Sequence, residues 1–207
     1  MSLAEQAYAL LEEQLVTLRL RPGDLIGEKD LMDQTRLGRT PVREAIQKLA
    51  ENGLLQILPR KGLMVAPLKR SELKQIVEAR RVLERLMVVK AAERADSGQR
   101  QALLLLASQL DTAGEDLDGF FKLDHRLDEI LEAACNNRYL VNALSAMHSQ
   151  CRRLWYLHRA NLDLPLSATL HAGLARAVAE NDGSGAIRAL DQIILILDQL
   201  IDGLDVY

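Results

Sequence analysis

Aromatic residues are scarce in this chain of 207 residues: they make up 3% of it, with one tryptophan, two phenylalanines and four tyrosines. Because β-sandwiches and barrels are enriched in aromatic and β-branched residues, this scarcity argues against an all-β fold. Leucine, alanine, glutamate, arginine and glutamine, which favour helices, are abundant instead. A hydrophobic share of 48% with 27% charged residues is ordinary for a globular protein and excludes a disordered chain.

Cysteines and long apolar runs are also lacking. Cys135 and Cys151 are the only cysteines, and both lie in helix-like segments, so we expect reduced thiols. The longest strongly apolar stretch, 193–197, is far too short to span a bilayer. Glu5 and Gln6 interrupt any early apolar run of a signal peptide. These absences predict a cytoplasmic protein without a membrane partner.

Positive charge is in short supply overall but is unevenly distributed. The formal net charge is −3, with 26 Lys and Arg against 29 Asp and Glu. Residues 36–61 nevertheless contain six basic residues and only two acidic ones. A local basic excess on an acidic protein is typical of a surface that binds phosphates. The alternative is a solvated surface without a partner.

The N-terminal third has the pattern of a winged helix-turn-helix. Apolar residues recur every three to four positions over 4–18, and a second short helix fits 28–34. Thr40 is suited to cap a third helix that ends at Asn52. Alternating apolar residues on either side of a turn predict a β-hairpin over 55–65. Three helices and a hairpin, with basic residues on the third helix and the hairpin tip, describe this DNA-binding fold.

The basic residues of this segment occupy the positions that read DNA in such a fold. Since Val42 and Ile46 face inward, Arg43 must face outward, one turn after Arg39 and Thr40. The N-terminal end of a recognition helix meets base edges in the major groove, and an arginine fork reaches guanine O6 and N7 together. The hairpin-tip residues Arg60, Lys61 and Gly62 are expected to meet phosphate or the minor groove.

The remainder of the chain is helical throughout. Beyond a linker at 68–70, helical periodicity predicts six helices, at 71–95, 99–113, 119–135, 138–160, 166–181 and 185–204. The expected fold is therefore mainly α. Residues 1–67 form a winged helix-turn-helix domain of three helices plus a β-hairpin, and residues 71–207 form an all-α bundle of about six helices.

Several polar residues fall on apolar faces of this bundle. Arg80 lies on the apolar stripe of its helix and needs an anionic partner, either Asp124 or Asp128 or the carboxylate of a ligand. Asp124 and Asp128 share one helix face, and His171 lies among apolar neighbours, so these three would form a metal site if they converge. Arg152 and Arg153 either line the same cavity or lie on a solvated surface.

The N-terminal motifs resemble those of GntR-family transcriptional regulators. They are Pro22-Gly23-Asp24-Leu25, Leu37-Gly38-Arg39-Thr40-Pro41-Val42-Arg43-Glu44-Ala45-Ile46, Asn52-Gly53-Leu54-Leu55 and Arg60-Lys61-Gly62. The resemblance implies operator binding as a homodimer, with DNA contacts from Lys29, Arg39, Thr40, Arg43, Lys61 and Gly62. Arg36 stands where a glycine is common in the family, and we expect it to keep the fold intact and to add a phosphate contact.

The second half resembles the FCD ligand-binding domain of the FadR-like branch, over 78–84, 91–95, 123–133 and 171–174. The resemblance implies an effector carboxylate on Arg80. We also predict Asp124, His171 and Arg152 as effector-binding residues. Many members hold a metal with one Asp and three His. Here Asp128 and Ile193 stand where His is usual, so we expect at most a weakly held divalent metal, such as zinc, on Asp124, Asp128 and His171.

These observations predict a sequence-specific DNA-binding repressor, not an enzyme, that a small carboxylate metabolite controls through residues 71–207. Two alternatives remain open. In one the bundle only dimerises, as the aliphatic Ile193 suggests. In the other the bundle is a metal-dependent enzyme, against which stands the lack of a nucleophile motif, a glycine-rich phosphate loop or an HExxH pattern.

Overall fold

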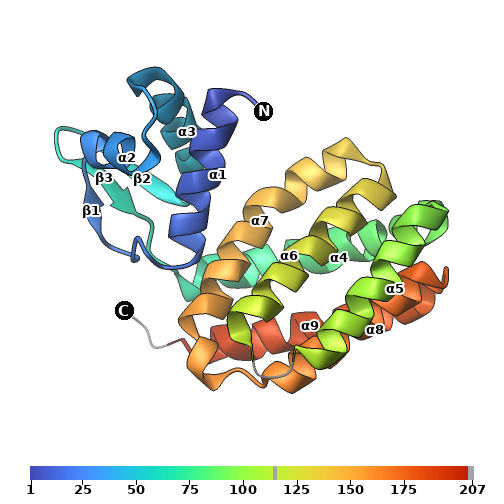
Figure 1. The fold of residues 1–207 in the computed structure, drawn as a ribbon. Coiled ribbons are helices and arrows are strands. Elements are labelled where there is room, and N and C mark those ends of the chain that lie inside the picture. Colours follow the sequence, from blue (N-terminus) through green and yellow to red (C-terminus); the bar gives the residue numbers. More distant parts are fainter. Residues whose placement is uncertain (114–115, 205–207) are drawn as a thin grey trace. The chain divides into compact units, whose positions relative to one another are not determined.

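The computed structural model describes residues 1–113 and 116–204, which form two compact units. The first unit comprises Met1–Leu73 together with His148–Leu157. The second comprises Lys74–Met147 together with residues 158–204. A small sheet and three helices dominate the first unit, and the described part of the second is built from helices (Figure 1). The fold is mainly α, which confirms the prediction.

The first unit has the predicted winged helix-turn-helix elements. Its helices are α1 (Leu3–Val16), α2 (Glu28–Thr35) and α3 (Arg39–Glu51), and its strands are β1 (Leu25–Ile26), β2 (Leu55–Leu58) and β3 (Gly62–Val65). Strands β2 and β3 form the expected antiparallel hairpin, with Leu58 opposite Gly62. The two-residue strand β1 pairs with the other edge of β3. A strand this short shows no alternation, so sequence analysis missed it.

Helix α3 begins earlier than predicted. Its N-cap is Gly38, in an extended conformation, so the prediction that Thr40 caps the helix is wrong. Thr40 and Pro41 lie in the first turn instead. Backbone N–H groups of the first turn have no partner within the helix, and proline is tolerated there because it lacks one. Arg39 thus becomes the first residue of the helix, at its positive end.

One apolar cluster holds these elements together. It joins Ala7, Leu11 and Leu15 of α1, Leu31 of α2, Val42, Ala45, Ile46 and Leu49 of α3, and Leu54, Leu55, Leu63 and Val65 of the sheet region, all buried. The four α3 positions that the periodicity places inward are among them. Burial of this face fixes the rotation of α3 about its axis, and the opposite face, which carries Arg43, is exposed.

The second unit contains the six predicted helices. They are α4 (Arg70–Arg94), which begins in the first unit, α5 (Ser97–Thr112), α6 (Leu117–Cys135), α7 (Arg138–Leu157), α8 (Leu164–Ala179) and α9 (Gly183–Asp202). A single 3-10 turn, η1 (Arg159–Asn161), follows α7. The part of α7 from His148 onward belongs to the first unit. None of the described helices is long and apolar enough to cross a membrane.

Aspartate caps determine where four of these helices begin. Asp96, Asp116, Asp163 and Asp182 each accept a hydrogen bond from the backbone N–H three residues on, at 2.8–3.0 Å. Capping by such a side chain satisfies an N–H that the helix leaves unpaired. The predicted starts are two residues late for α5, α6, α8 and α9, because the glycines and the proline of their first turns are typical of chain breaks.

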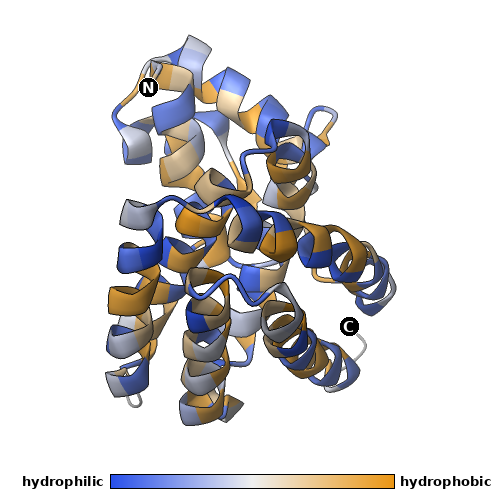
Figure 2. Ribbon diagram, turned by 90° about the vertical axis from the view of Figure 1, so that its right-hand side faces the viewer, coloured by the Kyte–Doolittle hydropathy of each residue, from blue (hydrophilic) through white to orange (hydrophobic). Residues whose placement is uncertain are grey.

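The bundle helices pack through their apolar faces. Helix α8 packs against α5, α6 and α9, and α5 also packs against α6. In Figure 2 the helices carry apolar residues and polar residues on different sides. The aliphatic residues Leu103, Leu110, Ala172, Ala175 and Ile194 are completely buried. With few aromatic residues available, leucine, isoleucine and alanine supply this core, as the composition predicts.

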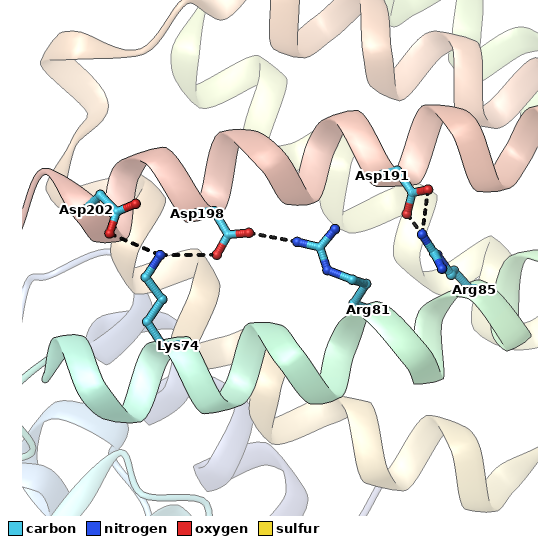
Figure 3. Close-up of polar contacts among 6 residues, drawn as sticks. All are labelled: Lys74, Arg81, Arg85, Asp191, Asp198 and Asp202. Atoms are coloured by element: carbon cyan, nitrogen blue, oxygen red, sulfur yellow. Dashed lines mark hydrogen bonds and ion pairs between the residues drawn. The ribbon is translucent and has the colours of Figure 1, made fainter.

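A row of ion pairs aligns α4 with α9 (Figure 3). It joins three cations of α4 to three aspartates of α9: Arg85 to Asp191 at 2.7 Å, Arg81 to Asp198 at 2.7 Å, and Lys74 to Asp198 at 3.5 Å and Asp202 at 3.1 Å. All six side chains are partly exposed, so each pair contributes about 0–1 kcal/mol. Their main effect is to set the register of the two helices.

Candidate DNA-binding and effector sites

All eight residues predicted to contact DNA are exposed on the first unit: Lys29, Arg36, Arg39, Thr40, Arg43, Arg60, Lys61 and Gly62. The side chains of Arg39 and Arg43 are 71% and 60% exposed, one turn apart at the N-terminal end of α3. Guanidinium groups at the N-terminal end of one helix can enter the major groove of DNA together with that helix. The structure therefore leaves these side chains accessible to a nucleic acid.

The two arginines share an acidic neighbour that sequence analysis did not assign to the site. Glu28, the first residue of α2, accepts a hydrogen bond from Nε of Arg43 at 2.7 Å. The same oxygen, Oε1, lies 3.4 Å from Nε of Arg39. The contact between Glu28 and Arg43 spans 15 residues of sequence and becomes visible only in the folded unit.

Two tight turns place the remaining basic residues. Arg36 ends α2 in the left-handed conformation, with φ 57°, which explains why glycine is usual at this position. The fold is kept, as predicted, but at a backbone cost of about 1–2 kcal/mol. At the hairpin tip Gly62 has φ +91°, and a Cβ there would lie 3.1 Å from the Ile26 carbonyl oxygen. A side chain at position 62 would therefore strain the backbone and crowd this carbonyl, whether or not DNA is bound.

In the second unit Arg80 is buried, as predicted, and one of its partners is Glu84. The Nη2 and Nε atoms of Arg80 lie 2.7 and 3.2 Å from Oε1 of Glu84, one turn further along α4. The two side chains are 11% and 3% exposed. The sequence pattern suggested carboxylates such as Asp124 and Asp128 as internal partners. Glu84 was not among the residues named, although i,i+4 pairs are the first to expect on a helix.

Asp124 of α6 and His171 of α8 are brought together. The Nε2 atom of His171 lies 3.2 Å from Oδ1 of Asp124, and its Nδ1 atom lies 2.7 Å from the Ser167 carbonyl oxygen. The ring of Phe120 stands edge-on to the imidazole at 5.2 Å. Burial alone would lower the pKa of His171, but the hydrogen bond and charge of Asp124, the Ser167 carbonyl and the charge of Asp128 raise it overall.

This pair does not amount to a metal centre. Within residues 1–113 and 116–204, no group of three or more His, Cys, Asp or Glu side chains is arranged to hold a metal ion. Ile193, where the family often has a histidine, is buried and has no donor atom. Zinc sites in proteins normally have at least three protein ligands. The side chains present therefore do not fit a tightly held metal on Asp124, Asp128 and His171.

Arg152 belongs to a different unit from the other predicted effector residues. It is half-buried in the part of α7 that belongs to the first unit, whereas Arg80, Asp124 and His171 belong to the second. Its neighbour Arg153 is fully buried. Arg153 donates hydrogen bonds to the Ala66 carbonyl and, at 3.0 Å, to Gln150. Burial lowers the pKa of Arg153 to about 10. The helical pattern predicts a cavity-lining or solvated Arg153, so its buried contact with Ala66 was not foreseen.

Comparison with known proteins agrees with this architecture. The HTH-type transcriptional repressor RspR of Escherichia coli (strain K12) is 27% identical over 191 residues, which cover 91% of this chain and 84% of RspR. The Nta operon transcriptional regulator of Aminobacter aminovorans is 27% identical over 188 residues, which cover 90% and 89% of the two chains. These relatives are transcriptional regulators, which confirms the prediction that the chain is not an enzyme.

Solved structures show the same fold. The structure of E. coli McbR/YncC matches with a TM-score of 0.84 at 22% identity and covers 98% of both chains. A transcriptional regulator from Rhodococcus sp. RHA1 matches with a TM-score of 0.75 at 20% identity, over 99% of this chain and 100% of that one. Residues 3–65 match the gntR family of bacterial regulatory proteins, and residues 75–195 match the FCD domain. The chain therefore belongs to the GntR family of transcriptional regulators, with an FCD domain following its winged helix-turn-helix.

Proposed function

We propose that this regulator is a repressor that binds a specific operator through α3 and the β2–β3 hairpin. The observation that carries the proposal is the exposure of Arg39 and Arg43 on the face of α3 opposite its buried stripe. In the major groove each guanidinium can donate two hydrogen bonds to one guanine. RspR, which is similar over most of the chain, is named a repressor, and this supports repression rather than activation.

The other exposed residues of the unit position the protein on the backbone. Lys29, Arg36, Thr40, Arg60 and Lys61 reach phosphate oxygens, and Gly62 allows close approach of the hairpin tip. Such contacts set the register of a protein on the duplex without reading sequence. One winged domain reads only a few base pairs, so we propose that a homodimer binds a palindromic operator with two half-sites.

Alanine at Arg39 or Arg43 should weaken operator binding by about 1–3 kcal/mol each and relax the base preference at one position of each half-site. Each substitution removes a fork that reads guanine while leaving the buried stripe of α3 intact. The measurement is fluorescence anisotropy with an operator selected from a random DNA library and with its single-base variants. Footprinting of the same operator should show two protected half-sites.

Lys61→Ala is the matched control, because it removes one positive charge from the hairpin tip. It should weaken the binding of operator DNA and of random DNA to the same extent, and it should reduce the slope of log K against log salt by about 0.9. If the alanine variants of Arg39 and Arg43 bound the operator as the parent does, α3 would not be the recognition helix.

For the second unit we propose that a small carboxylate effector binds Arg80 and releases the operator. The support is a buried guanidinium inside an FCD domain, in the same unit as the Asp124–His171 pair. An incoming carboxylate would compete with Glu84 for Arg80. Loss of the Arg80–Glu84 contact would alter α4, the helix that carries both residues. No metal enters this proposal, and neither does Arg152, which lies outside the second unit.

Arg80→Lys should abolish most of the response to the effector while keeping a cation for Glu84. Lysine cannot form the two parallel hydrogen bonds that an arginine forms with a carboxylate. In a thermal-shift screen of small mono- and dicarboxylates, a ligand at about 100 times its Kd stabilises the parent by about 2.7 kcal/mol. Arg81→Lys, at a partly exposed ion pair with Asp198, is the control and should respond as the parent does. Equal responses of both variants would place the effector elsewhere.

A further inference from the structure

We propose that Glu28 is a positioning residue for DNA recognition. Its carboxylate holds the guanidinium groups of Arg43 and Arg39 in a reading geometry, and its charge reduces binding to random DNA. This inference rests on the proposed role of α3 in operator binding. It adds a specificity-determining residue on α2, a helix that supplies only backbone contacts in the proposal above.

The three side chains form a clamp, in which the carboxylate of Glu28 contacts the guanidinium groups of both Arg39 and Arg43. Glu28 begins α2, directly after its N-cap Gly27, and is 31% exposed. Its Oε1 atom is 2.7 Å from Nε of Arg43 and 3.4 Å from Nε of Arg39. Because the arginines lie one turn apart on α3, a single carboxylate oxygen at the start of α2 reaches both. The two helices pack on each other in the same unit, so the clamp rests on rigid elements.

The atom that Glu28 binds determines which donors remain for DNA. A guanidinium offers five N–H groups in a fixed fork, and reading guanine requires two parallel ones. With Nε of Arg43 bound to Glu28, the pair left to face a guanine is Nη1 and Nη2. No hydrogen bond to either of these atoms is found within the described residues. The ion pair also restricts the rotamers of a side chain that otherwise loses about 2 kcal/mol of entropy on binding.

The charge of Glu28 acts against phosphate contacts. Two arginines alone present two positive charges to any DNA, and the carboxylate reduces this local charge by one. An arginine held at 2.7 Å must break its ion pair before it can turn to a phosphate that lies beyond the reach of its Nη atoms. At the operator the guanine contacts compensate for the lost attraction, but random DNA offers no such compensation. Glu28 thus lowers random-DNA binding more than operator binding, which is how repulsive elements raise specificity.

Glu28→Gln tests the proposal, because glutamine keeps an oxygen acceptor and removes the charge. Binding to random DNA should tighten, with the slope of log K against log salt steeper by about 0.9. The ratio of operator to random-DNA affinity should fall about tenfold, the discrimination of a well-placed guanine contact. Asp33→Asn is the matched control, since it removes the same charge from an exposed position of α2 that forms no ion pair within the described residues. It should leave the ratio unchanged.

Three results would overturn the proposal. The first is an equal change of the ratio in both variants, which would show a long-range charge effect. The second is an unchanged ratio in Glu28→Gln. The third is a lower Tm for Glu28→Gln with weaker binding of both DNAs, which would show a merely structural role. The Arg43→Ala variant separates these results from failure of the proposed function: if it loses operator affinity, α3 reads DNA and only the role of Glu28 is wrong.

Discussion

Leu11→Ala should lower the free energy of unfolding of the first unit by about 2–5 kcal/mol, the cost of a leucine-sized cavity that its surroundings cannot fill. Leu11 of α1 is 1% exposed and lies in the cluster that buries the inner face of α3. Its neighbour Leu10 is 43% exposed, so Leu10→Ala should change the stability by about 0.5 kcal/mol or less. The two substitutions remove the same atoms from adjacent positions of one helix.

The single tryptophan gives a direct readout of this comparison. Trp155 is 6% exposed and belongs to the first unit, so its fluorescence reports unfolding of that unit in urea. The midpoint for Leu11→Ala should fall well below that of the parent, with an unchanged slope. Similar midpoints for both leucine variants would mean that α1 does not hold the core of the DNA-binding unit in solution.

The helices and the hairpin were predictable because each has a strong local pattern. Buried positions such as Leu11, Leu15, Val42 and Leu49 recur at helical spacing, and the strands of the hairpin flank a marked turn. The errors lie at element ends. Helices α6 and α9 begin two residues before the expected starts, directly after their caps Asp116 and Asp182, and Gly38 rather than Thr40 caps α3. Several residue types can serve as a cap, and the choice among them depends on packing further along the helix.

The sites were predictable in their residue types but not in their pairings. Exposure of Arg39 and Arg43 follows from the inward stripe of α3, which periodicity reveals. Their contact with Glu28 depends on how α2 and α3 cross, and periodicity carries no information on this crossing. Likewise, Asp124 and His171 were expected on inward faces, but that they meet at 3.2 Å is a property of the packed bundle.

Arg153 shows most clearly what local patterns miss. Its helical position does not distinguish a solvated arginine from a buried one, yet it is 0% exposed. It donates hydrogen bonds to the carbonyl of Ala66, which follows β3, and to Oε1 of Gln150. The Nε2 atom of Gln150 in turn donates to the Asn52 and Gly53 carbonyls, at 3.2 and 2.8 Å, just after α3. The end of α3 and the end of the hairpin are thus tied to one segment of α7, all within the first unit.

Arg153→Ala should therefore lower the free energy of unfolding of the first unit by about 3 kcal/mol or more, since it leaves a cavity and a buried carbonyl without its donor. Arg153→Met should lower the free energy of unfolding by about 1 kcal/mol at most, because methionine fills much of the volume and the cost of burying the charge disappears. Urea unfolding followed by Trp155 fluorescence measures both, and Arg159→Ala, at an exposed position after α7, serves as the control. A methionine variant as unstable as the alanine variant would show that the hydrogen bonds, rather than the packing, hold this segment. An alanine variant as stable as the parent would show that Arg153 is not buried in solution.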